Sequence, residues 1–249
     1  MPSCLAKSSK LTDLSPSERY QRAKTRSKGK EFANFTATLK FPLDDFQEKS
    51  CIALESGSNV LVAAPTGAGK TIVGEFAIHL AVASGQKVFY TTPIKALSNQ
   101  KFAELAARYG KEKVGLLTGD ANNNSDAQIV VMTTEVLRNM IYATSTSLRD
   151  LGYVVMDEVH YLADRFRGAV WEEVLIHLME SVQVISLSAT VSNAEEFGEW
   201  LGEVRGETEV IVSEIRPIPL FQHVLIGNRL LDLFDAPGRV NPEVLNRER

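Results

Sequence analysis

From Phe41 onward, short apolar runs rich in β-branched residues alternate with longer segments whose apolar residues recur at helical spacing. The apolar runs, which predict strands, lie at Val60–Ala63, Val88–Thr92, Val114–Leu117, Ile129–Met132, Tyr153–Met156, Val182–Leu187 and Glu209–Val212. Helical patterns lie between most of them, for example at Lys95–Tyr109, Trp171–Met179 and Asn193–Leu201. Such alternation is typical of a parallel sheet with helices on both faces. We therefore predict an α/β fold with a mostly parallel sheet.

The two ends of the chain fall outside this alternation. In residues 1–40 we expect a disordered start and then a short helix, because Ser15-Pro16-Ser17-Glu18 combines an N-cap, a proline at N1 and an acid at N3. Residues 213–249 contain four prolines and end in NRER, which predicts a strand or hairpin followed by a linker. The polar stretch Gly119–Asp126 predicts an exposed loop. We divide the chain into an extension at 1–40, an α/β domain at 41–212 and a linker region at 213–249.

The composition, with 44% hydrophobic and 23% charged residues over 249 positions, is that of an ordinary globular domain. The net charge of −4 is uneven: residues 1–30 hold eight Lys or Arg against two acids, a charge of +6, so the remainder carries −10. The acidic body argues against a broad nucleic-acid-binding face but allows a narrow groove that contacts phosphates through amides and hydroxyls. The basic start is either a solvated tail helix or an arm that contacts phosphates.

The remaining bulk features point to a reducing compartment. No apolar run reaches the ~18 residues of a membrane helix, and the first residues lack the apolar region of a signal peptide. The two cysteines, Cys4 in a polar tail and Cys51 in a predicted helix, do not predict a disulfide framework. We expect a cytoplasmic protein with no membrane partner.

The strongest chemical signal is APTGAGKT, Ala64–Thr71, between the apolar run NVLVA and the helical pattern TIVGEFAIHLAVA. A strand, a Gly-rich turn, Lys-Thr and a helix form a phosphate-binding loop, or P-loop. Backbone N–H groups and the helix N-terminus surround an anion, Lys70 adds a positive charge and Thr71 a hydroxyl for Mg²⁺. The strict pattern has glycine where this chain has Ala64, so we predict a variant loop that binds a nucleoside triphosphate.

A second triphosphate element follows the apolar run Tyr153–Met156, where Asp157 and Glu158 open the string DEVH. An acid at the end of a strand can hold the Mg²⁺ that Thr71 also contacts. The next acid can orient or deprotonate the attacking water. An Asp-Glu pair alone is weak, because a solvated strand end has the same pattern; together with the P-loop it predicts an NTPase site.

DEVH is a DExH box, and the chain resembles the first RecA-like domain of a superfamily 2 helicase from about Phe41 to Leu201. The other matching segments are FPLDDFQ (Phe41–Gln47, a Q-type motif), TTPIKALSNQKF (Thr91–Phe102, motif Ia), LTGD (Leu117–Asp120, motif Ib), VMTTEVL (Val131–Leu137) and Ser188-Ala189-Thr190 (motif III). PIKALSNQK, VMTTEVLRNM and RFRGAVWEEV narrow the resemblance to superkiller-type DExH RNA helicases, and within them to actinobacterial HelY-type proteins.

The resemblance implies a role for each matching residue. The ATP-binding set is Phe41, Gln47, Ala64, Pro65, Thr66, Gly67, Ala68, Gly69, Lys70 and Thr71, with Gln47 reading the adenine edge. Thr71 and Asp157 would hold Mg²⁺, and the catalytic set is Glu158, Lys70 and Asp157. His160, Ser188 and Thr190 would couple the sites, and Pro93, Lys95, Thr118, Gly119, Thr133 and Thr134 would contact nucleic acid. Thr133 and Thr134 could also serve as N-caps, and a lone His160 is commonly structural.

The resemblance also implies a missing part. These motors need a second RecA-like domain whose arginine fingers reach the triphosphate, and the chain contains no QxxGRxGR-like string. An arginine finger accelerates turnover by about 10³–10⁵-fold. We therefore expect a domain that binds ATP–Mg²⁺ and single-stranded RNA but hydrolyses ATP slowly and does not unwind a duplex alone. Three alternatives stay open: a DNA-directed helicase domain, a non-catalytic nucleotide-dependent RNA-binding module, and, less favoured because NKxD and LSGGQ strings are absent, another P-loop NTPase.

Overall fold

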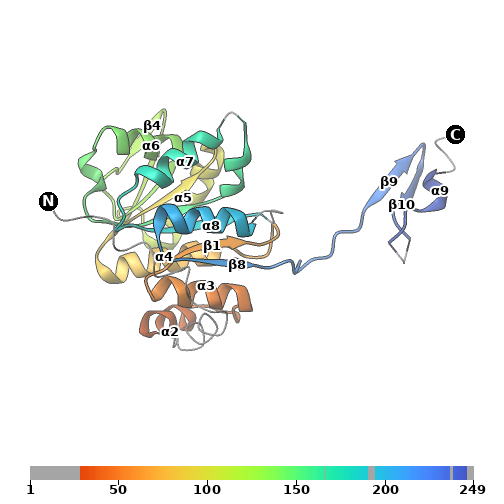
Figure 1. Cartoon of the computed structure of the whole chain (residues 1–249), viewed down its shortest axis with the longest axis horizontal. Coiled ribbons are helices and arrows are strands. Elements are labelled where there is room, and N and C mark those ends of the chain that lie inside the picture. Colours follow the sequence, from red (N-terminus) through yellow and green to blue (C-terminus); the bar gives the residue numbers. More distant parts are fainter. Residues whose placement is uncertain (1–28, 166, 190–193, 236–237, 246–249) are drawn as a thin grey trace. The chain divides into compact units, whose positions relative to one another are not determined.

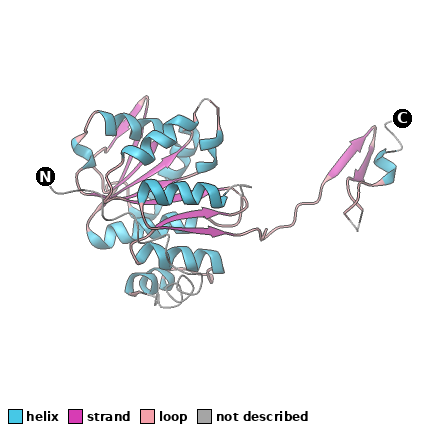
Figure 2. Cartoon of the chain, viewed as in Figure 1, coloured by secondary structure: helices cyan, strands magenta, loops and turns pink. Residues whose placement is uncertain are grey.

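The computed structural model describes residues 29–165, 167–189, 194–235 and 238–245. The chain separates into two compact units, with the division between Ile215 and Arg216. The first unit is an eight-stranded sheet with helices on both faces (Figures 1 and 2). The predicted α/β fold, a RecA-like P-loop domain with a mostly parallel sheet, is confirmed.

The sheet of the first unit has the strand order β4-β3-β5-β2-β6-β7-β1-β8. Its strands are β1 (Asn59–Ala63), β2 (Lys87–Thr92), β3 (Val114–Thr118), β4 (Ala121–Asn123), β5 (Ile129–Thr133), β6 (Leu151–Met156), β7 (Gln183–Ser188) and β8 (Thr208–Val212). Every neighbouring pair is parallel except β3 and β4. The carboxyl ends of all the parallel strands therefore share one edge of the sheet, as the ends of parallel strands must.

Helices fill both faces of the sheet. They are α2 (Lys30–Ala37), α3 (Asp45–Glu55), α4 (Thr71–Ser84), α5 (Lys95–Tyr109), α6 (Thr134–Tyr142), η2 (Thr146–Leu148), η3 (Val159–Ala163), α7 (Gly168–His177) and α8 (Ala194–Arg205). Val60 and Val62 join the core under α3 and α4, whereas Leu61 joins the core under α7 and α8. Because strand side chains alternate between faces, a strand buried on both sides is apolar throughout, as the short runs predicted.

Several element boundaries differ from the sequence-based expectation, and one expected loop contains a strand. Helix α7 begins at Gly168 rather than Trp171 and ends at His177 rather than Met179. Part of the expected loop Gly119–Asp126 forms β4, which pairs antiparallel with β3 at the edge of the sheet. Asparagine is a poor strand former, so the composition of this stretch did not predict a strand. The strand is stabilised by its pairing with β3. Asn122 and Asn123 are exposed, as predicted for the loop.

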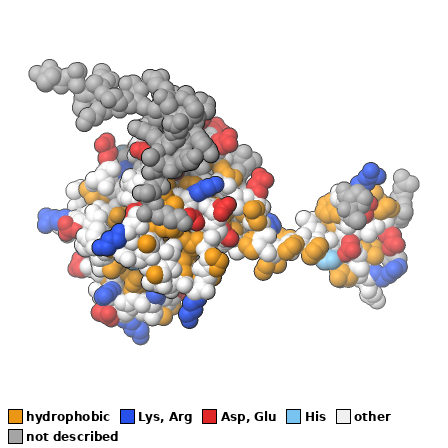
Figure 3. Space-filling view, turned by 90° about the horizontal axis from the view of Figure 1, so that it is seen from below, with side chains coloured by type: hydrophobic (Ala, Val, Ile, Leu, Met, Phe, Trp, Pro, Cys, Tyr) orange, Lys and Arg blue, Asp and Glu red, His pale blue; other side chains and the backbone are white. Residues whose placement is uncertain are grey.

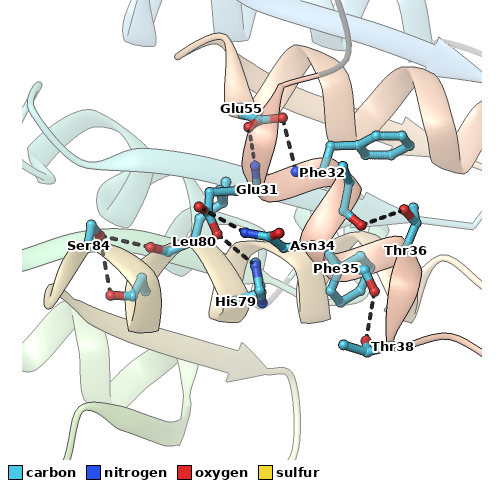
Figure 4. Close-up of polar contacts among 12 residues, drawn as sticks. Glu31, Phe32, Asn34, Phe35, Thr36, Thr38, Glu55, His79, Leu80 and Ser84 are labelled. Carbon is cyan, nitrogen blue, oxygen red and sulfur yellow. Dashed lines mark hydrogen bonds and ion pairs between the residues drawn. The ribbon is translucent and has the colours of Figure 1, made fainter.

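Helix α2 is part of the first unit and packs against α3 and α4, although the sequence analysis assigned its residues to an extension (Figure 4). The Glu55 carboxylate at the end of α3 accepts hydrogen bonds from the backbone nitrogens of Glu31 and Phe32, at 2.8 and 3.2 Å. These bonds satisfy N–H groups that the first turn of a helix leaves unpaired. Phe35 packs against Phe76 of α4 with ring centroids 5.1 Å apart. The helix expected to begin at residue 15 lies outside the described residues.

The second unit contains the hairpin of β9 (His223–Ile226) and β10 (Arg229–Asp232), followed by α9 (Pro242–Leu245). Gly227, with φ +62°, is the first residue of the two-residue connection, where glycine accommodates a positive φ. Between β8 and β9 the chain exposes a run of apolar side chains (Figure 3): Ile215, Ile218, Leu220 and Phe221.

The structure also describes the length of the helices and one of the two cysteines. Across the described residues, no helix combines the length and the apolar character needed to cross a bilayer. Cys51 is a free, fully buried thiol of α3, and burial raises its pKa above the usual value. Cys4 lies outside the described residues.

Candidate nucleotide and nucleic-acid site

The P-loop connects the buried strand β1 to α4 at the carboxyl edge of the sheet. Gly67 and Gly69 both have φ +85°, a conformation that favours glycine. At Gly69 a Cβ would also lie 2.6 Å from Nε2 of Gln47. Ala64 does not adopt a positive φ, and its N–H donates to the Ser188 carbonyl of β7 at 3.2 Å. The alanine at the first position therefore fits the backbone of the loop without strain.

Lys70 lies over the loop that precedes it. Its Nζ donates to the carbonyl oxygens of Ala64 and Pro65 at 2.8 and 3.1 Å, and only 9% of the residue is exposed. Burial lowers the pKa of the Lys70 ammonium, and the charges of Glu158 and Asp157 oppose that shift. A phosphate oxygen can replace the two carbonyls as acceptor, so the geometry suits an anion at this loop.

The other P-loop residues differ in exposure. Thr66, Gly67 and Gly69 are exposed, whereas Pro65 and Ala68 are buried; Thr71 is half-buried where α4 begins.

Gln47 fastens the start of α3 to the P-loop. Its Oε1 accepts from the backbone nitrogen of Asp44 at 2.9 Å, which closes a capping box. Its Nε2 donates to the carbonyls of Gly69 at 3.0 Å and Ala68 at 3.5 Å. The buried amide is thus bonded to the protein itself, so this arrangement gives the predicted adenine contact no direct support.

Phe41 lies in a different place from Gln47. Its side chain is 54% exposed and lines an open cavity of about 290 Å³ between α2 and the start of α3. The wall of this cavity includes Phe32, Thr36 and Pro42 but not Gln47. The structure therefore does not bring the two residues of the Q-type motif to one cavity.

Asp157 stands at the carboxyl end of β6, held by the neighbouring strand β2. Its N–H donates to the Thr91 carbonyl at 3.0 Å, and its Oδ2 accepts from the Tyr90 phenol at 2.8 Å. Its Oδ1 accepts from the Glu158 N–H at 2.9 Å. Burial, and then the charge of Asp157, raise the pKa of Tyr90 well above its ordinary value, so the phenol stays a donor. Sequence reasoning missed Tyr90, whose only signal was its place in an apolar run.

Glu158 adopts the left-handed conformation, with φ +55° and ψ +43°. For a residue other than glycine this conformation costs about 1–3 kcal/mol and is found disproportionately at functional sites. Glu158 is the N-cap residue of η3, whereas Asp157 directly follows β6. The two adjacent acids thus have separate environments, as a metal ligand and a water-orienting base require.

The coupling residues are only partly joined. His160 Nδ1 lies 3.2 Å from Glu158 Oε2, an ion-pair distance, yet the described residues give this nitrogen no hydrogen bond of good geometry. The Ser188 hydroxyl is buried and likewise has no hydrogen-bond partner among the described residues. Thr190 lies outside the described residues. Coupling through these three side chains therefore stays a prediction.

The residues assigned to nucleic acid gather at the ends of β2, β3 and β5. Lys95 forms an ion pair with Asp120, which also accepts from the Thr118 hydroxyl at 3.0 Å. Hydrogen bonds from Lys95 and then Thr118 lower the pKa of the Asp120 carboxyl. Pro93 is buried and Gly119 is exposed. Lys95 is the one positively charged residue among those that the sequence assigned to nucleic acid. Its charge is paired with that of Asp120, an acid of motif Ib.

The two threonines of the TTEVL segment have different surroundings. Thr134 is fully buried, and its hydroxyl donates to the Thr92 carbonyl at 3.4 Å, so it supports motif Ia instead of facing a strand of nucleic acid. Thr133 is the N-cap of α6 but its side chain makes no capping hydrogen bond. This burial gives the predicted phosphate contact of Thr134 no direct support, so the contact stays a prediction.

Mg²⁺ bound with ATP would neutralise phosphate charge. Thr71 and Asp157 would hold it, and the donor set fits, because a hydroxyl and a carboxylate are the hard oxygen ligands that this ion uses beside phosphates. The Asp157 carboxylate is already oriented by Tyr90 and the Glu158 N–H. In the described chain, no group of three or more His, Cys, Asp or Glu side chains could hold a metal without such a partner.

The sequence of this domain matches a known protein family. The family model described as DEAD/DEAH box helicase matches residues 44–197, which include the P-loop, the DEVH box and motif III. The chain belongs to the DEAD/DEAH box helicase family. The resemblance to a superfamily 2 DExH-box helicase is thereby confirmed.

The similar proteins are several times longer than the segment that matches this chain. It is 66% identical over 221 residues to the probable helicase HelY of Mycobacterium tuberculosis (strain H37Rv), covering 88% of this chain and 24% of HelY. It is 49% identical over 204 residues to the DExH-box ATP-dependent RNA helicase DExH15 of Arabidopsis thaliana, covering 80% of this chain and 17% of that protein. The helicase domain thus spans about a quarter or less of the length of the curated relatives it matches.

A solved structure supports the same fold for the helicase domain. The Mycobacterium smegmatis helicase Lhr, bound to ssDNA and AMP-PNP, is 28% identical, with a TM-score of 0.59. The match covers 77% of this chain and 28% of that one.

Proposed function

We propose that this chain is the ATP-binding motor domain of an ATP-dependent helicase acting on RNA. It binds ATP with Mg²⁺ at the P-loop and DEVH box, and single-stranded RNA at the neighbouring ends of β2, β3 and β5. The observation that carries the proposal is the common edge of the sheet. Lys70 follows β1, Asp157 follows β6, and Lys95 follows β2, which pairs with β6.

Each residue has a defined task in this proposal. Lys70 transfers its two hydrogen bonds from loop carbonyls to phosphate oxygens, and Asp157 with Thr71 holds the metal. Glu158 orients or deprotonates the attacking water. Phe41 and Gln47 recognise adenine, which requires Gln47 to exchange at least one of its present partners. His160, Ser188 and Thr190 transmit the nucleotide state.

RNA is favoured over DNA by the RNA helicase name of the Arabidopsis relative at 49% identity. Single-stranded DNA is the alternative, supported by the ssDNA in the Lhr structure at 28% identity. Contacts to phosphates alone do not distinguish the two sugars. Residues 213–249 are proposed to lead to a second RecA-like domain, in keeping with the larger size of the relatives. Without that domain and its arginine fingers, the chain turns over ATP slowly.

The test measures nucleotide and strand binding by the 249-residue chain. A fluorescent ATP analogue should bind in the presence of Mg²⁺, and Lys70→Ala should abolish that binding; unchanged affinity in the variant would contradict the P-loop assignment. Labelled RNA and DNA strands of matched sequence then report substrate preference by anisotropy. Turnover should be slow with and without RNA, and brisk RNA-stimulated hydrolysis by this chain would contradict the need for a second domain.

A further inference from the structure

Arg167 belongs to the segment RFRGAVWEEV, to which the sequence assigned no function, and the fold brings it to motif Ia. Its Nη1 donates to the Pro93 carbonyl at 3.3 Å, although the two residues are 74 positions apart in the sequence. The Arg167 side chain is exposed. Pro93 follows β2 directly and precedes α5, so Arg167 stands at the carboxyl edge of the sheet beside the start of the α5 helix.

The backbone around Arg167 is fixed by local contacts. The Arg167 N–H donates to Asp164 Oδ1 at 2.9 Å, and the Gly168 N–H donates to the Asp164 carbonyl at 2.8 Å. A Cβ on Gly168 would lie 2.1 Å from the Leu162 carbonyl oxygen, so this position admits only glycine without a backbone shift. The turn between η3 and α7 therefore sets where the arginine side chain begins.

Two separate segments bond to consecutive carbonyls of motif Ia. The Thr134 hydroxyl donates to the Thr92 carbonyl at 3.4 Å, and Arg167 donates to the next carbonyl, that of Pro93. Lys95 follows two residues later and opens α5. Lys95, a cation of motif Ia itself, is paired with Asp120, and Arg167 adds a second cation beside Pro93.

The chemistry of Arg167 suits a phosphate better than it suits a purely structural role. A guanidinium carries five N–H donors and a permanent charge, and the Pro93 contact uses Nη1. Arginine binds phosphate oxygens with two parallel hydrogen bonds where geometry allows. Holding one backbone carbonyl does not need a charge, and exposure leaves that charge accessible to a partner from solution.

We propose that Arg167 contacts a backbone phosphate of the bound single strand while it holds the Pro93 carbonyl. The proposal rests on the proposed function, since it adds a residue to the same nucleic-acid surface. The strand then meets the loop that follows the DEVH box as well as motif Ia. Arg167 binds phosphate in a sequence-independent way, so it strengthens attachment without reading bases.

The experiment measures the salt dependence of strand binding by the full chain. The affinity of a labelled single-stranded RNA is determined by anisotropy between about 50 and 200 mM salt, because each phosphate contact contributes about −0.7 to the slope of log K against log salt for single strands. Arg167→Gln should lower the affinity severalfold and make the slope shallower by about 0.7. Arg167→Lys, which keeps the charge, should restore most of the slope.

Arg149→Gln is the matched control. Arg149 is exposed and precedes β6, at the opposite edge of the sheet, so its loss should leave the slope as in the unsubstituted chain. Equal slopes for Arg167→Gln and the unsubstituted chain would overturn the inference while leaving the proposed function intact. A uniform loss of affinity with an unchanged slope would also overturn it, because it would mean a structural role. Failure of the unsubstituted chain to bind any strand would refute the proposed function and the inference with it.

Discussion

Tyr90 donates its phenol hydrogen to Oδ2 of Asp157 across 2.8 Å, joining β2 to the end of β6. Tyr90 is fully buried, and its pKa is raised by burial and by the charge of Asp157. The carboxylate assigned to Mg²⁺ is therefore oriented by the strand that also carries motif Ia. This bond is a direct physical link between the proposed nucleotide site and the strand that leads into the proposed nucleic-acid site, both on the common edge of the sheet.

Removing the Tyr90 hydroxyl should weaken binding of the metal-bound nucleotide. Tyr90→Phe keeps the ring in the core, and a hydrogen bond to a charged group contributes about 1.5–3 kcal/mol, so affinity for ATP with Mg²⁺ should fall about 10- to 150-fold. Affinity measured in a metal chelator should not change. Tyr153→Phe serves as the control, because Tyr153 is a half-buried tyrosine whose hydroxyl interacts with Ser84. Equal losses with and without Mg²⁺ would show that Tyr90 supports only the core.

Neutralising Glu158 should separate binding from chemistry. Glu158→Gln keeps the length of the side chain, and the residue can keep the left-handed conformation that Glu158 adopts. ATP affinity should therefore stay near that of the unsubstituted chain. Residual turnover, measured under single-turnover conditions, should disappear because an amide cannot accept the proton of water. Glu199→Gln, exposed on α8, makes the same charge change away from the site. Normal turnover in Glu158→Gln would remove Glu158 from the role of base.

The sequence predicted the sheet because buried parallel strands leave a strong signal. Seven apolar runs became seven parallel strands, with boundaries shifted by a few residues, and α5 matched Lys95–Tyr109. Strand β4 was missed because its Asn-rich stretch has no apolar signal, and the sheet edge stabilises it through backbone pairing. Local patterns therefore locate buried elements well and exposed edge elements poorly.

The candidate site was predicted as far as its residues follow motif spacing. The P-loop and DEVH acids were found because their backbone geometry requires glycines and strand ends at fixed positions. Tyr90 and Arg167 were missed because each acts on a residue far away in sequence, Asp157 and Pro93. Burial of Thr134 was also unforeseen, since a small polar side chain has the same appearance in a sequence whether it faces solvent or a carbonyl.

Lys70 should impose a pH dependence on ATP binding. Its ammonium is the form that attracts phosphate, and its pKa in the folded chain lies below the ordinary 10.5 because burial outweighs the acidic neighbours. As pH rises through this lowered pKa the lysine loses its charge, so ATP affinity should fall at a pH where a solvent-exposed lysine is still protonated. Arg at this position stays charged, so Lys70→Arg should show no such fall over the same range. A parallel fall in both proteins would assign the titration to another group.

Releasing Lys95 from its acidic partner should strengthen nucleic-acid binding. Asp120→Asn removes the charge that pairs with Lys95 and leaves the ammonium to a phosphate, so the affinity for a single strand should rise severalfold at low salt. Asp126→Asn makes the same change in net charge in the same loop region, where the residue is also exposed. Anisotropy titrations of both variants separate local release from bulk charge. Equal gains would mean that net charge alone accounts for the effect.

Helix α2 should contribute to the stability of the first unit, even though it lies within residues that the sequence assigned to an extension. Phe35 is 1% exposed and packs on Phe76, whereas Phe41, a few residues later, is 54% exposed. Truncating a buried phenylalanine to alanine costs about 3–5 kcal/mol, whereas exposed positions change stability by about 0.5 kcal/mol. Phe35→Ala should therefore lower the urea midpoint of unfolding markedly, and Phe41→Ala should lower it little.

The pair of variants separates docking of α2 from loss of aromatic surface in general, because both remove the same side chain. The helix is held at its N-terminus by Glu55 and at its centre by Phe35, so loss of Phe35 weakens the larger apolar contact while the polar one stays. If Phe35→Ala and Phe41→Ala unfold at the same urea concentration, α2 does not belong to the cooperative unit. Unfolding is followed by far-ultraviolet circular dichroism, which reports the helices of the whole first unit.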